Sequence, residues 1–223
     1  MTEVADMEVA LSLERFARYV AWAGGDRALA LELYALNTRI SEALYTPLQV
    51  LELALRNRVH TVMAAAHGER WFEADDLLQA PHQREQVEVA LAELAKDGKE
   101  PLPGRVVAAL TFSFWTAMVS PSYEDLWRST LSPIAAKPDG KRLSRKQLSR
   151  PLTPIRLLRN RIAHHEPILH WNTRKHHAAM TQITSWLSPT AAAWCATVDR
   201  YPSVYPAGGY QLEPAPDPDV DAE

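Results

Sequence analysis

Nine consecutive residues bring together side chains that could hold a phosphate and move a proton: Arg159-Asn160-Arg161-Ile162-Ala163-His164-His165-Glu166-Pro167. Arginine binds phosphate as a permanently charged fork. Histidine is the side chain best suited to proton transfer near neutral pH. These groups are enough to cleave RNA without a metal ion or a protein nucleophile, because RNA carries its own nucleophile in the 2′-hydroxyl. RNA cleavage is therefore the sharpest hypothesis that these residues support.

Helical spacing predicts which side chains of the motif share a face. At about 100° per residue, Ile155, Leu158 and Ile162 form one buried stripe. Asn160 and His164 are four residues apart and share a different, polar face of the same helix. We therefore expect the amide and the imidazole to act on one side of the helix.

The arginine of the motif is offset from this polar face. Arg159 lies about 140° around an ideal helix from His164, so it is poorly placed to share one phosphate with that histidine. Two copies of the helix that meet across a two-fold axis would remove the difficulty, because each arginine could face the other chain's histidine. The spacing thus favours a composite site in a homodimer; a distorted last turn before Pro167 is the alternative.

Two other interpretations of the motif stay open. The arginine and the amide could be solvated, and a histidine near a helix C-terminus can simply stabilise the helix dipole. Metal binding is the second, although the spacing lacks the histidine pair with an intervening glutamate that hydrolytic zinc sites use. We predict neither a metal nor a cofactor. The histidines that cluster in this region are His164, His165, His170, His176 and His177.

The charge of the chain is distributed unevenly. Net charge is −3, but residues 137–175 hold 11 of the 24 lysines and arginines and only two of the 27 acidic residues, which makes this stretch +9 and the remainder −12. A polyanion would be drawn to one region and repelled elsewhere. A solvated basic loop is the alternative interpretation. The residues predicted to bind RNA are Lys141, Arg142, Arg145, Lys146, Arg156, Arg161 and His165.

Apolar periodicity predicts an all-α fold, with no competing strand pattern. Asp26 can cap one helix, Thr46-Pro47 begins a new one, and Ser144 with Gln147 resembles a capping box. Pro151 and Pro154 should break the chain, so that the motif helix starts at Pro154. The expected helices span about 11–22, 27–44, 47–67, 81–96, 105–119, 123–131 and 154–166, with two more from 173 and 189.

Composition favours a cytoplasmic protein. No apolar run approaches the roughly 20 residues that cross a bilayer, and the first residues lack the order of a secretory signal. A single cysteine, Cys195, cannot form an internal disulfide and is expected to be packing. We expect one all-α domain over residues 1–199, followed by a Pro-rich, acidic C-terminal tail over 200–223.

The motif resembles the signature of the HEPN superfamily, which is an arginine, a polar residue, a few spacers and a histidine. More narrowly, the chain is similar to the Abi-like (abortive infection) proteins of bacteria. Their closing motif, Leu-Arg-Asn-x-x-Ala-His-His, is matched by Leu158, Arg159, Asn160, Ala163, His164 and His165.

The resemblance covers roughly residues 10–198 and includes landmarks outside the motif. One departure is the absence of a glycine that is common after the first Phe-Ser-like pair, which affects packing more than chemistry. The landmarks are Leu33-Tyr34, Asn37, Leu44-Tyr45, Glu52, Leu55-Arg56-Asn57, Gly68, Trp71, Phe112-Ser113-Phe114-Trp115, Trp127, Trp186-Leu187 and Trp194.

The resemblance implies a HEPN-type helical bundle with additional flanking helices, and a metal-independent endoribonuclease. Such proteins are typically dimeric toxins that stop growth during phage infection and are neutralised by a protein or RNA antitoxin. By position, Arg159 and His164 would be the catalytic pair and Asn160 their polar partner. His164 would move the proton between the 2′-hydroxyl and the leaving oxygen, Arg159 would stabilise charge on the phosphate, and products would end in a cyclic phosphate.

An earlier run, Arg56-Asn57-Arg58-Val59-His60, mimics the motif but is one residue shorter. Arg56 is spaced to pair with Glu52 at i, i+4, so we interpret Glu52, Arg56 and Asn57 as support for the site or the fold, with direct RNA contact as the alternative. The rival function for the whole chain is a non-catalytic RNA-binding or scaffold protein of the same fold.

Overall fold

The computed structural model describes residues 2–11, 13–74 and 76–213, and this part of the chain is all-α. Its only β-type pairing is an isolated antiparallel bridge between Ala136 and Arg142. The expected all-α class is therefore confirmed. Within the described residues, no helix combines the length and the apolar character needed to cross a membrane.

Eleven α-helices of the described chain alternate with short 3-10 and π turns. The helices are α1 (Thr2–Leu11), α2 (Leu13–Trp22), α3 (Arg27–His67), α4 (Pro81–Lys96), α5 (Pro103–Ala109), α6 (Phe112–Ala117), α7 (Glu124–Leu126), α8 (Arg145–Ala163), α9 (Thr173–Leu187), α10 (Pro189–Val198) and α11 (Tyr201–Val204). The short turns are η1 (Trp71–Glu73), η2 (Pro121–Tyr123), η3 (Trp127–Leu131) and η4 (Ser132–Ile134).

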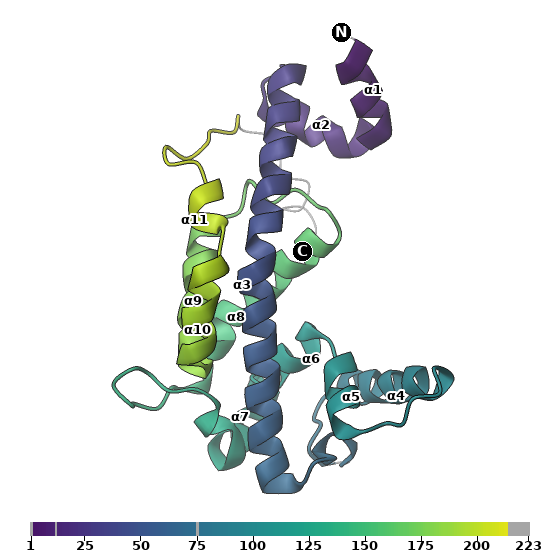
Figure 1. The fold of residues 1–223 in the computed structure, drawn as a ribbon, viewed down its shortest axis with the longest axis vertical. Helices are drawn as coiled ribbons and strands as arrows, with labels where there is room; N and C mark the ends of the chain where they lie inside the picture. Colours follow the sequence, from purple (N-terminus) through teal and green to yellow (C-terminus); the bar gives the residue numbers. More distant parts are fainter. Residues whose placement is uncertain (1, 12, 75, 214–223) are drawn as a thin grey trace.

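Helix α3 is the axis of the molecule, and the other helices are arranged along it (Figure 1). It begins at the expected cap, where the Asp26 carboxylate accepts from the backbone N–H groups of Ala28 and Leu29 at 2.9 and 3.1 Å. It then continues for 41 residues through the buried Pro47, so the predicted break at Thr46-Pro47 is wrong. The proline removes one backbone hydrogen bond, but α3 packs against α2, α6, α9 and α10.

Helix α8 carries the motif, and it also runs through two prolines. The capping box of Ser144 and Gln147 is confirmed and starts the helix at Arg145, so the break predicted at Pro151 and Pro154 is wrong. Burial explains the result: a fully buried leucine or isoleucine contributes about 1.5–3 kcal/mol, and four of them outweigh the roughly 3 kcal/mol that each proline costs. The buried stripe of α8 comprises Leu148, Leu152, Ile155 and Leu158.

The helix expected over 105–119 is divided into α5 and α6. The Thr111 hydroxyl caps α6 by accepting from the backbone N–H of Phe114 at 3.4 Å, which ends one helix and begins the next. Phe112, Phe114 and Trp115 are buried, as expected of core anchors. Phe114 and Trp115 both pack against Trp71.

The segment expected to be a tail from residue 200 is packed over its first part. Helix α11 lies in this segment, and the Tyr201 hydroxyl donates to Thr173 Oγ1 at 2.8 Å. The Tyr210 hydroxyl donates to the carbonyl of Leu169 at 2.8 Å. The ordered packing therefore extends past residue 199 to at least residue 213, and the acidic end over 214–223 lies outside the described residues.

A buried amide ties the segment after the motif to α3. The backbone N–H of Ile168 donates to Asn37 Oδ1 at 2.8 Å, and both residues are buried. This bond fixes the chain directly after α8 against the first half of α3.

We predict that Asn37→Ala lowers the free energy of unfolding by about 1–3 kcal/mol, because it leaves the buried N–H of Ile168 without an acceptor. The measurement is chemical unfolding monitored by circular dichroism. Thr38→Ala is the control, since the exposed Thr38 hydroxyl bonds only within its own helix, to the carbonyl of Tyr34. Equal stability of Asn37→Ala and Thr38→Ala would contradict the prediction.

Candidate functional site

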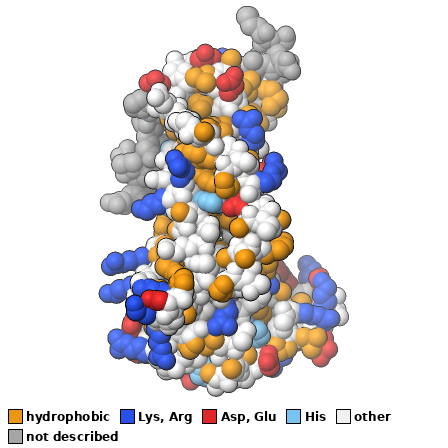
Figure 2. Space-filling model, turned by 60° about the vertical axis from the view of Figure 1, so that its left-hand side comes forward, with side chains coloured by type: hydrophobic (Ala, Val, Ile, Leu, Met, Phe, Trp, Pro, Cys, Tyr) orange, Lys and Arg blue, Asp and Glu red, His pale blue; other side chains and the backbone are white. Residues whose placement is uncertain are grey.

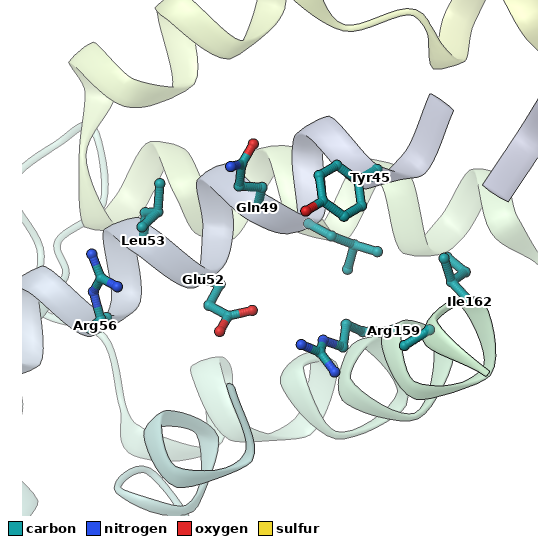
Figure 3. A pocket seen from close by; sticks show the side chains of 9 residues that line it. Tyr45, Gln49, Glu52, Leu53, Arg56, Arg159 and Ile162 are labelled. Atoms are coloured by element: carbon teal, nitrogen blue, oxygen red, sulfur yellow. The ribbon is translucent and has the colours of Figure 1, made fainter. Parts of the chain in front are cut away.

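A cavity of about 300 Å³ lies between α3 and α8 and contains the arginine of the motif. Both helices pack against α6 and against α9, which places them on either side of the cavity. Figure 3 shows side chains of the two helices facing each other across this space. Helix α3 contributes Tyr45, Leu48, Gln49, Glu52, Leu53 and Arg56, and helix α8 contributes Arg159, Ile162 and Ala163.

Arg159 and Glu52 are the polar groups that the fold brings together from distant parts of the sequence. Both side chains are half-buried, and neither makes a hydrogen bond or an ion pair with any residue that the structure describes. Burial raises the pKa of the Glu52 carboxyl above its usual range, and the positive charges of Arg159 and Arg56 oppose that rise. The cavity is thus a partly buried site in which a guanidinium and a carboxylate come from different helices and form no direct hydrogen bond.

The predicted supporting residues divide between the cavity and the surface. Glu52 and Arg56 line the cavity, but within the described chain they form no ion pair with each other, so the pair expected from their i, i+4 spacing is absent. Arg56 Nε donates instead to Asn57 Oδ1 at 3.2 Å. Asn57 itself is exposed and does not line the cavity.

The motif helix ends in a Schellman turn that leaves both histidines exposed. The backbone N–H of His165 donates to the carbonyl of Ile162 at 3.1 Å, and that of Glu166 donates to the carbonyl of Arg161 at 2.8 Å. His165 has a φ of 56°, which places it at the left-handed position of this turn. Backbone groups therefore close the helix end, and the His164 and His165 imidazoles are not used for it.

The offset expected between the arginine and the histidine is present. Arg159 lines the α3–α8 cavity, whereas His164 is exposed and is not among the cavity residues. By helical spacing, Asn160 and His164 share their face of α8 with Arg156 and Arg150. One chain thus presents its arginine and its histidine on different faces of α8.

That second face of α8 borders a groove rich in hydroxyl groups. The groove has a volume of about 590 Å³ and lies between α8 and the segments around α6 and η2. Hydroxyl and guanidinium groups are the ones that proteins use to hold the phosphates and sugars of nucleic acids. The polar side chains that line it are His82, Ser113, Thr116, Ser120, Ser122, Ser149, Arg150, Thr153 and Arg156.

Five of the seven residues predicted to bind RNA remain accessible. Arg142, Lys146 and His165 are exposed, and Arg156 is half-buried in the groove. Lys141 is exposed and pairs with Asp139 at 2.9 Å. Figure 2 shows lysine and arginine side chains gathered along one edge of the lower half of the molecule.

Arg145 and Arg161 have internal partners instead. The Arg145 side chain is only 4% exposed and its Nε lies 2.6 Å from Glu124 Oε2, while its Nη1 donates to the carbonyl of Val119 at 2.9 Å. Arg145 therefore cannot reach a phosphate, which corrects its predicted role. Arg161 Nε donates to the carbonyl of Pro167 at 3.2 Å, and its guanidinium stacks on Trp171, so this arginine holds the turn after the motif.

Four cavity residues on α3 were not among the predicted site residues: Tyr45, Leu48, Gln49 and Leu53. Tyr45 and Gln49 share the i, i+4, i+7, i+11 spacing of Glu52 and Arg56, which could have identified them. The predicted helix break at Thr46-Pro47 hid the pattern, because it left Tyr45 in the break and Gln49 in the following helix.

The clustered histidines do not gather into a metal-binding group. In the part of the chain that the structure describes, no three His, Cys, Asp or Glu side chains are placed to hold one ion. The rings of His170 and His176 lie beside Trp22 and Trp171. His177 Nε2 bonds to Asp199 Oδ2 at 2.6 Å.

Comparison of the chain with protein-family models, with curated proteins and with solved structures gave no match.

We predict different effects for two neighbouring basic residues. Arg145→Gln should lower the free energy of unfolding by about 1–3 kcal/mol, because it removes the guanidinium that donates to the buried carbonyl of Val119. Lys146→Gln should change it by less than about 0.5 kcal/mol but should reduce the salt dependence of RNA binding by about one unit of slope if it contacts one phosphate.

The two readouts are chemical unfolding and fluorescence anisotropy of labelled RNA at several salt concentrations. A folded Arg145→Gln variant of full stability that binds RNA as weakly as Lys146→Gln would contradict the internal role of Arg145.

Proposed function

We propose that this protein is a metal-independent endoribonuclease of the HEPN type. The observation that carries the proposal is Arg159, whose guanidinium lines a cavity and has no hydrogen bond or ion pair with any described residue. Because no described residue accepts from this guanidinium, its donors are open to a substrate phosphate, which would accept them in the bidentate geometry that arginine favours.

The residues of the motif divide the chemistry between them. Arg159 binds the scissile phosphate and stabilises the charge that develops on it. His164 takes the proton of the 2′-hydroxyl or returns one to the leaving oxygen, and Asn160 donates a hydrogen bond on the same face. The 2′-oxygen attacks phosphorus, the bond to the 5′-oxygen breaks, and the products are a 2′,3′-cyclic phosphate and a 5′-hydroxyl.

A homodimer would complete the site. Arg159 and His164 lie on different faces of α8, and a two-fold axis would oppose the arginine of one chain to the histidine of the other. Apolar side chains for such a contact lie beside both groups: Tyr45 is 63% exposed at the cavity, and Leu157 is 44% exposed on the histidine face.

The groove beside α8 offers a path for the RNA chain. Arg150 and Arg156 line it together with hydroxyl groups, and Lys146 and Arg142 continue the basic surface toward the start of the helix. Neutralisation of several phosphates along this path would give binding its affinity without reading sequence.

The resemblance to Abi-like proteins suggests the biological role: a toxin that cleaves RNA during phage infection and is held by an antitoxin. The alternative is an RNA-binding or scaffold protein that has the fold without the activity. Cleavage of RNA by the purified protein in excess chelator separates the two.

We predict that His164→Ala abolishes chelator-resistant RNA cleavage and growth inhibition and leaves the helical circular dichroism spectrum unchanged. The physical reason is that His164 is the proton-transfer group on the Asn160 face of the motif. His67→Ala, at the far end of α3, is the control and should keep activity. Full cleavage by His164→Ala would move the proton-transfer group elsewhere, with His165 and His60 the next residues to test.

We also predict that Arg159→Ala and His164→Ala are each inactive but regain activity in a heterodimer. The heterodimer contains one intact composite site, so about half the per-dimer activity should return. Co-expression of the two variants with different tags provides the heterodimer, and RNA cleavage after double purification measures the result. A verified heterodimer without activity, or a monomer that cleaves RNA, would contradict the composite site.

A further inference from the structure

Glu52 is a carboxylate whose hydrogen-bonding capacity is unused. It lies half-buried in the α3–α8 cavity, and Figure 3 shows it on α3, across the cavity from Arg159 on α8. No described residue donates a hydrogen bond to it, so its two oxygens are open to donors from solvent or from a ligand. A ligand with N–H or O–H donors would supply them.

The surrounding charges restrict the kind of donor. Arg56 and Arg159 also line the cavity, and their positive charges would repel an ammonium or guanidinium group. A neutral donor joined to an anion meets no such repulsion, because the carboxylate takes the donor and the arginines take the anion. A nucleotide has this combination.

The rest of the lining suits a flat, largely apolar ring. Leu48, Leu53 and Ile162 form apolar walls, and the exposed ring of Tyr45 stands beside them. A volume of about 300 Å³ is enough for a purine, and bases of single-stranded RNA commonly stack on aromatic side chains.

We propose that this cavity binds a guanine base of the RNA substrate, in contact with Glu52 and Tyr45. Guanine presents two adjacent donors, N1–H and the 2-amino group, which match the two oxygens of one carboxylate. Adenine and cytosine present a single amino group beside a ring acceptor, and uracil presents one N–H between two carbonyl oxygens that the carboxylate repels. The inference rests on the proposed function and adds to it that cleavage occurs next to guanosine.

The test is the binding of the 3′- and 5′-monophosphates of the four nucleosides to the full chain, measured by isothermal titration calorimetry. A guanosine monophosphate should bind most tightly. Glu52→Gln should reduce that affinity roughly tenfold or more while leaving the weaker binding of the other nucleotides unchanged. Glu88→Gln, on the exposed face of α4, is the matched control and should bind as the native chain does. A circular dichroism spectrum confirms that each variant is folded.

Three results would overturn the inference: equal affinity for all four bases, no binding of any nucleotide, or a guanosine preference that survives in folded Glu52→Gln. Mapping of the cleavage sites in an RNA of mixed sequence distinguishes failure of the guanine site from failure of the proposed nuclease function. Cleavage without base preference would support the proposed nuclease function and contradict the guanine site. Selective guanosine binding without cleavage would support the guanine site and contradict the proposed nuclease function.

Discussion

The packing of α3 and α8 on the same two neighbours, α6 and α9, is the constraint on which the candidate site depends. The buried stripe of α8, from Leu148 to Leu158, fixes the rotation of that helix. With this rotation set, Arg159 must face the space beside α3, and Asn160 and His164 must face away from it. The same packing keeps a cavity between α3 and α8, because their contacts with α6 and α9 hold them on either side of it. A single apolar stripe thus decides where three polar side chains can act.

The electrostatics of the site follow from this arrangement. Taken out of full contact with water, Glu52 is costly to ionise, and the arginines on either side of it offset only part of that cost. Because Glu52 and Arg159 form no ion pair with each other, the carboxylate oxygens and the guanidinium N–H groups stay open to a ligand. Arg145 shows the contrast: bound to Glu124 and Val119, it serves the fold and has nothing left for a ligand. Arg145 and Arg159 thus differ in that only Arg145 has hydrogen-bond partners among the described residues.

The sequence was sufficient for the helical class, for the caps at Asp26 and Ser144, and for the offset of Arg159 from His164, because each depends on local geometry. It failed at Pro47, Pro151 and Pro154, where burial of flanking leucines outweighs the local cost of proline. It also failed at Arg145, since charge composition cannot tell a surface arginine from one that reaches Glu124. The cavity could not be predicted, because it depends on how residues more than 100 positions apart pack. The roles of the motif residues remain predictions.

In the proposed function, the RNA supplies its own nucleophile, and the protein supplies only a phosphate-binding arginine and a proton-transferring histidine. The most direct measurement is mass spectrometry of the products from an RNA oligonucleotide incubated with the protein in excess chelator. The same oligonucleotide with a 2′-deoxy substitution at the mapped cleavage site is the control substrate. We predict 2′,3′-cyclic phosphate and 5′-hydroxyl ends from the first and no cut at the substituted position in the second. Cleavage at the 2′-deoxy position, or products with a 3′-hydroxyl and a 5′-phosphate, would contradict the claim.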